Sequence, residues 1–138
     1  MERHFLKTGL IAIAILAISA GGYADTPTEL ETRSVALSEN IKVGDRIGHI
    51  RFLGMLQLPN PTVDGMRFSP LSGLAWDDDD GILYAISDKG FLFHLQPVFE
   101  NGVLTGLKLL KAVHLRELGS GKPLKGTRGD CEGLDILH

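Results

Sequence analysis

Cysteine is almost absent from this 138-residue sequence, and Cys131 is its single occurrence. One cysteine cannot form an intramolecular disulfide, so a disulfide framework is excluded. The thiol is also a poor candidate for a nucleophile, because Asp130 and Glu132 on either side oppose formation of the thiolate. We therefore interpret Cys131 as a small buried residue.

Clustered positive charge is also missing. The sequence has 14 Lys and Arg residues against 17 Asp and Glu residues, which gives a formal net charge of -3. The sequence has no basic cluster that could neutralise the phosphates of a nucleic-acid backbone, so we do not expect nucleic acid as a partner. The dispersed histidines show no zinc-binding spacing.

Helical periodicity is weak, and the best helical candidate, residues 107–118, also fits a strand. We interpret it as a strand because it follows the hairpin-type turn Glu100-Asn101-Gly102.

The N-terminus has the order of a signal peptide. Arg3 and Lys7 precede an apolar run over residues 10–20, and Ala24 offers a small residue at a cleavage site. The alternative, an uncleaved membrane anchor, is disfavoured because the run is shorter than the ~20 residues that span a bilayer. We expect residues 1–24 to be removed, which leaves an exported protein with no stable membrane span. Removal takes away two basic residues and one acidic residue, leaving 12 against 16.

The part that follows the signal begins without a clear pattern. Residues 25–45 are polar, and we expect a linker or loosely packed lead-in. Residues 50–58 predict a first strand, ended by Pro59-Asn60-Pro61, because proline cannot continue a hydrogen-bonded ladder. Residues 62–69 are expected to form a loop.

The next stretch predicts a β-meander. Three short apolar runs, residues 72–77, 82–87 and 91–96, are separated by turn signals that contain Gly81 and Gly90. A fourth run covers residues 103–114, so the four strands amount to one four-stranded antiparallel sheet, the size of a propeller blade. The run ILYAIS is apolar almost without alternation, which predicts a strand covered on both faces.

A short internal repeat supports this interpretation. Ser72-Gly73-Leu74 returns after 60 residues as Glu132-Gly133-Leu134, and the glycine-rich segment 119–129 between them predicts a long connection.

The motifs LSGLAWDDDDGILYAISDKG and GDCEGLDI resemble the esterase-like phytase, or phytase-like, domain family of exported bacterial β-propeller proteins. The resemblance covers residues 50–138. It implies an all-β fold, a partial β-propeller of about two blades of antiparallel four-stranded sheets. Residues 46–138 would form the N-terminal portion of such a domain. Because family members are longer, we expect a truncated, inactive fragment that would fold poorly alone.

The resemblance also directs attention to the acidic residues near strand ends. Asp88, Asp130 and Glu132 supply the oxygen ligands that Ca²⁺ prefers, and Asp88 and Glu132 are the candidate catalytic carboxylates. Arg128 and Lys122 are the candidate substrate-binding residues for a phosphate ester. The alternative makes Asp88 a turn-forming residue and the other two acids a solvated loop.

Two classes of function follow. The first is a metal-assisted phosphoesterase or esterase acting on a small-molecule ester, as the family name implies. The second is a non-catalytic periplasmic β-propeller that binds a ligand or a protein partner, because a fold does not fix a function.

Overall fold

The computed structural model describes residues 26–68 and 70–137, and these residues are all-β with antiparallel pairing throughout. The all-β prediction is confirmed. The predicted signal peptide, residues 1–24, lies outside the described residues. The strands, followed by one 3₁₀ turn, η1 (Gly126–Arg128), are β1 (Thr28–Glu29), β2 (Arg33–Ser34), β3 (Arg46–Ile47), β4 (Ile50–Arg51), β5 (Leu56–Gln57), β6 (Thr62–Val63), β7 (Met66–Arg67), β8 (Leu71–Asp77), β9 (Ile82–Ser87), β10 (Phe91–Glu100) and β11 (Val103–His114).

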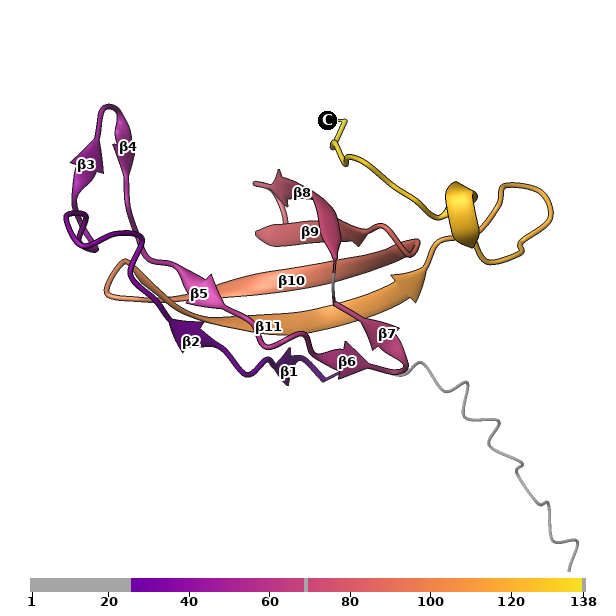
Figure 1. Cartoon of the computed structure of the whole chain (residues 1–138), viewed down its shortest axis with the longest axis horizontal. Coiled ribbons are helices and arrows are strands. Elements are labelled where there is room, and N and C mark those ends of the chain that lie inside the picture. Colours follow the sequence, from indigo (N-terminus) through magenta and orange to yellow (C-terminus); the bar gives the residue numbers. More distant parts are fainter. Residues whose placement is uncertain (1–25, 69, 138) are drawn as a thin grey trace, which may run out of the picture.

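Strands β8 to β11 form the predicted meander, and they lie side by side in chain order (Figure 1). The turns contain residues with positive φ, as tight hairpins require: Gly81 has a φ of 66°, and Asn101 and Gly102 have φ values of 51° and 78°. The strand interpretation of residues 107–118 is confirmed as far as His114, where β11 ends.

Strand β10 runs past the predicted end at residue 96 to Glu100, although it contains Pro97. Leu95 is the last residue of β10 that pairs with β9, whereas pairing with β11 continues to Glu100. Beyond Leu95 the strand therefore has a neighbour on one side only, where a proline without an N–H group is tolerated.

Part of the segment predicted as a loose lead-in is packed into the structure. Strand β1 pairs with β11, Thr28 opposite Leu109, and this gives a five-stranded sheet in the order β1-β11-β10-β9-β8. The next residue, Leu30, is buried, and its N–H donates to the carbonyl of Leu107 at 3.0 Å. A two-residue strand has too short a pattern to be seen in a polar sequence.

Residues 33–67 form three small hairpins or ladders beside the large sheet, in place of the predicted strand over 50–58 and loop over 62–69. Within 50–58 only β4 and β5 are regular, because Gly54, with a φ of 138°, interrupts the run. Its neighbour Leu53 accepts a hydrogen bond from the N–H of Leu104 in β11. The predicted loop contains the β6–β7 hairpin, with Asp64 and Gly65 at positive φ; Ser69 is outside the described residues.

The core lies between these N-terminal strands and one face of the large sheet. Its buried side chains alternate along the strands, as a half-covered sheet requires. Phe68 stacks on Phe93 with ring centroids 4.1 Å apart. The buried cluster consists of Leu30, Phe68, Ala85, Phe93, Leu95 and Leu109.

Strand β9 is covered on both faces over its second half. Ala85, Ile86 and Ser87 are all buried, whereas Ile82, Leu83 and Tyr84 are half-buried. The prediction drawn from ILYAIS is therefore confirmed for the three residues that lead into the turn before Gly90.

The chain after β11 folds back along the sheet. Residues 115–124 make a hairpin, closed by a bridge between Arg116 and Pro123 and by a 2.8 Å bond from the Leu124 N–H to the Leu115 carbonyl. The predicted connection 119–129 therefore includes ordered turns. The segment then returns to β8, where a Cβ added to Gly73 would lie 2.9 Å from the backbone nitrogen of Leu134.

Candidate functional site

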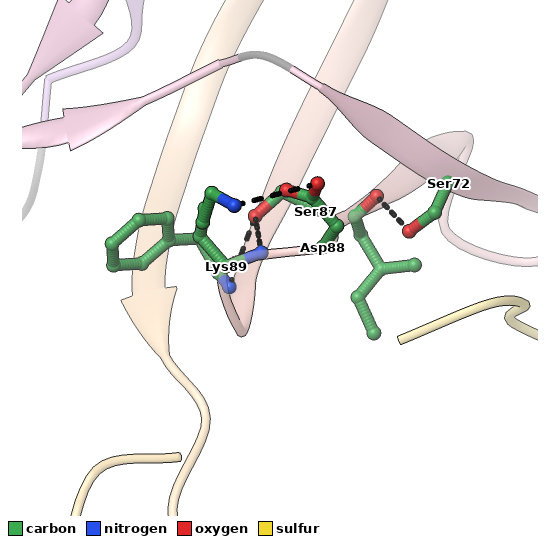
Figure 2. A network of polar contacts seen from close by, with 6 residues as sticks. Ser72, Ser87, Asp88 and Lys89 are labelled. Carbon is green, nitrogen blue, oxygen red and sulfur yellow. Dashed lines mark hydrogen bonds and ion pairs between the residues drawn. The ribbon is translucent and has the colours of Figure 1, made fainter. Parts of the chain in front are cut away.

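Asp88 lies in the turn between β9 and β10, where the buried hydroxyl of Ser87 organises the backbone (Figure 2). The Ser87 side chain has no solvent exposure, and its oxygen accepts hydrogen bonds from the N–H groups of Lys89 and Phe91, each at 3.3 Å. The Gly90 N–H donates to the Ser87 carbonyl at 3.1 Å. A serine hydroxyl that bonds its own following backbone is a known turn-forming device.

The Asp88 carboxylate is accordingly not the group that shapes this turn. Its Oδ2 lies 3.6 Å from the Lys89 ammonium, and its side chain is 26% exposed. Its Oδ1 is shielded from solvent and has no hydrogen-bond partner among the described residues. A shielded carboxylate oxygen without a donor is costly, so Oδ1 is an unsatisfied acceptor at this turn.

Asp130 and Glu132 lie on the segment that returns toward β8, and both are exposed. Two close backbone contacts fix this segment. A Cβ on Gly90, next to the Asp88 turn, would lie 3.4 Å from Gly129, and a Cβ on Gly73 would lie 3.0 Å from the Gly133 carbonyl carbon. Asp130 and Glu132 thus lie between two anchor points on the β8–β9 part of the sheet.

The three predicted calcium ligands are not assembled into a metal site among the described residues. Over residues 26–68 and 70–137, no three Asp, Glu, His or Cys side chains gather into a group that would hold a metal ion. The oxygen chemistry of Asp88, Asp130 and Glu132 suits Ca²⁺, and the unpartnered Oδ1 of Asp88 is a fitting donor.

Arg128 and Lys122, the predicted substrate-binding residues, are brought together by the structure. Both line a surface hollow of about 290 Å³, whose other walls are Glu117, Pro123 and Lys125. Arg128 forms an ion pair with Glu117. Glu117 and Lys125 were not predicted to belong to this site, because no spacing rule connects them to Arg128.

Cys131 is half-buried and free. Its N–H donates to the Gly129 carbonyl at 3.1 Å, which makes it part of the turn after η1. The interpretation of this residue as small and buried holds in part.

A second group of polar residues, not predicted from the sequence, lies on the face of the sheet opposite the core. His94 pairs with Tyr84 on one side and Lys111 on the other, and its ring meets the Tyr84 ring edge-on with centroids 4.7 Å apart. Burial, and then the positive charge of Lys111, lowers the pKa of His94 below 6.5. The alternation of β10 was the only sequence signal for this arrangement.

No protein-family model, curated protein or solved structure matches this chain. Within the described ranges, no helix has the length and apolar character needed to cross a membrane. The resemblance to the phytase-like family therefore depends on the sequence motifs alone.

Proposed function

We propose that this chain is an exported phytase-like protein, with residues 46–138 forming part of a β-propeller that acts as a metal-assisted phosphoesterase or esterase. The observation that supports it is the contact between the two copies of the internal repeat, Gly73 against Gly133 and Leu134. Between the two copies, β8 to β11 make one antiparallel four-stranded meander in chain order. A propeller is built from such four-stranded units, repeated around an axis.

In this proposal the carboxylates near the β9–β10 turn serve the chemistry. Asp88 and Glu132 are the catalytic carboxylates, and together with Asp130 they are the ligands for Ca²⁺. Bound Ca²⁺ would neutralise a phosphate ester and activate water. Arg128 and Lys122 hold the phosphate through charge-assisted hydrogen bonds. The Ser87 hydroxyl keeps the Asp88 turn in place, because it accepts the N–H groups of the two residues that follow Asp88 in the bend.

The test is calorimetric titration with Ca²⁺ of a complete β-propeller domain that contains residues 46–138, with hydrolysis of a phosphate ester measured in parallel. Asp88→Asn and Glu132→Gln should each weaken Ca²⁺ binding by more than about tenfold, since each removes a charged oxygen ligand. Glu39→Gln is the matched control, because Glu39 is exposed and lies far from this segment in the sequence. Unchanged binding and turnover in both site variants would remove these residues from the proposed site.

Export has its own test. Mass spectrometry of the protein purified from its host should give a mature chain that starts near Asp25. An intact Met1 in the membrane fraction would contradict export with cleavage.

The second candidate is a non-catalytic propeller that binds a ligand or a protein partner. It is favoured by β8, an edge strand of the large sheet whose Leu74 and Trp76 side chains are 60% and 45% exposed. Exposed apolar groups on a strand edge are typical of interaction surfaces. Folded protein that hydrolyses no ester, yet loses partner binding on Trp76→Ser, would favour this candidate over the enzyme.

A further inference from the structure

The hollow beside η1 combines an ordered frame with an excess of positive charge. The frame is the hairpin 115–124: the Glu117 N–H donates to the Lys122 carbonyl at 2.8 Å, and the Gly121 N–H donates back to the Glu117 carbonyl at 3.0 Å. The 3₁₀ turn η1 then carries Arg128 over the same hollow. Two separate turns therefore present cations to one space of about 290 Å³.

Three cations face this space against one carboxylate. Lys122, Lys125 and Arg128 are all exposed, whereas the Glu117 side chain is 27% exposed. Arg128 is paired with Glu117, and neither lysine forms an ion pair with any residue in the described ranges. The hollow thus carries two positive charges in excess, and two of its cations are free to bind an anion.

Glu117 is held in place from both sides. One carboxylate oxygen contacts Arg128, and the other accepts a hydrogen bond from the Ser120 hydroxyl at 2.7 Å. A guanidinium presents a planar fork of donors that suits a carboxylate and a phosphate equally well. Glu117 therefore occupies one guanidinium nitrogen of Arg128, Nη1, that an incoming phosphate would use.

We propose that this hollow binds a phosphate group through Lys122, Lys125 and Arg128, and that Glu117 is an internal competitor which the phosphate displaces from Arg128. The inference rests on the proposed function for its ligand class, a phosphate monoester, and it adds Lys125 and the competition by Glu117. Binding in this hollow needs no metal ion. The phosphate lies against the two lysines first, and the Arg128 fork completes the site when Glu117 turns away.

The experiment is titration of the mature chain with inorganic phosphate in the presence of EDTA. Calorimetry measures the affinity, and NMR of the backbone amides shows which residues respond. Lys122→Ala and Lys125→Ala should each weaken binding about three- to fivefold, the range of solvent-exposed charge pairs. Glu117→Gln should tighten binding by a similar factor, because it removes the competing charge. Lys42→Ala and Glu39→Gln are the matched controls at exposed positions outside the hollow.

Each outcome separates this inference from the proposed enzyme. Phosphate binding in EDTA that weakens in the lysine variants, together with no ester hydrolysis by the complete domain in the presence of Ca²⁺, upholds the inference and contradicts the enzyme. No phosphate binding in EDTA, beside Ca²⁺-dependent hydrolysis that falls in Lys122→Ala and is unchanged in Lys125→Ala, upholds the enzyme and overturns the inference. If the affinity for phosphate does not rise in Glu117→Gln, Glu117 does not compete with phosphate for Arg128. Amide spectra that match the parent chain establish that the variants are folded.

Discussion

The large sheet has one well-covered end and one open end, although the same meander builds both. Over β10 and β11 the N-terminal strands cover the core face, so Phe93 and Leu95 are 0% and 2% exposed. At β8 that cover stops, and Leu74, in the same cross-strand row as Ala85 and Phe93, is 60% exposed. Apolar residues at equivalent sheet positions therefore differ in burial because different segments pack on them. The alternation of residues within one strand does not reveal which segments these are.

Replacing Phe93 should have the largest effect. Phe93→Ala removes a buried ring that stacks on Phe68, and the cavity should lower the free energy of unfolding by about 3–5 kcal/mol. Leu74→Ala, in the same row at the open end, should change it by less than about 0.5 kcal/mol. Urea denaturation followed by fluorescence measures both, and equal losses would show that the open end is covered in solution.

Gly73 tests whether the opposite face of the open strand is covered. A methyl group at this position would meet the backbone of Leu134 at 2.9 Å, so Gly73→Ala should cost about 2 kcal/mol through displacement of the returning segment. Gly133→Ala is the control, since a Cβ there meets nothing within 4 Å. Limited proteolysis of residues 130–137 should accelerate only in Gly73→Ala. Equal cleavage of both variants would contradict the contact.

Two serine hydroxyls that bond backbone groups can be compared: Ser87 at the end of β9 and Ser72 in β8. Ser87→Ala leaves the N–H groups of Lys89 and Phe91 without their acceptor and should cost about 1–2 kcal/mol. Ser72 donates one longer bond, 3.4 Å, to the Ile86 carbonyl, so Ser72→Ala should cost less. Thermal melts compare the two, and the reverse order would assign the turn to another group.

His94 should give the smallest effect, and it depends on pH. Because burial and Lys111 lower the folded-state pKa of His94 below 6.5, the unfolded chain binds the proton more readily. The contribution of neutral His94 to the free energy of unfolding is therefore complete at pH values above 6.5, and it is lost as the pH falls below 6.5. Stability should therefore fall more steeply between about pH 7 and about pH 5 in the parent chain than in His94→Gln, with Lys111→Ala intermediate. Identical slopes in all three would remove His94 from the pH dependence.

The meander was predictable from the sequence because its signals are local. Apolar runs of strand length and glycines at Gly81, Gly90 and Gly102 are sufficient to place four antiparallel strands. The strands between residues 28 and 67 were not predictable, because each has two residues and its position depends on the larger sheet. Their register is set by distant partners, as in the pairing of Thr28 with Leu109.

The candidate site divides in the same way. The sequence located Asp88 in a turn and related Arg128 to Lys122, and the structure brings that pair into one hollow. The role of Ser87 was overlooked, because the aspartate in an S-D-x-G turn is the more familiar turn former. The ion pair between Arg128 and Glu117 joins residues eleven positions apart, and no motif indicates it.

The contact between Gly73 and Gly133 means that the chain from one Gly-Leu dipeptide to the next begins and ends at almost the same point in space. A stretch with this property behaves as a closed module: it can lengthen at a distant tip, such as the exposed Asn101-Gly102 turn, without shifting what comes before or after it. Such a module is also suited to tandem duplication, since each added copy starts where its predecessor stops. Length variation among proteins of this design should therefore concentrate at that tip and avoid the two dipeptides.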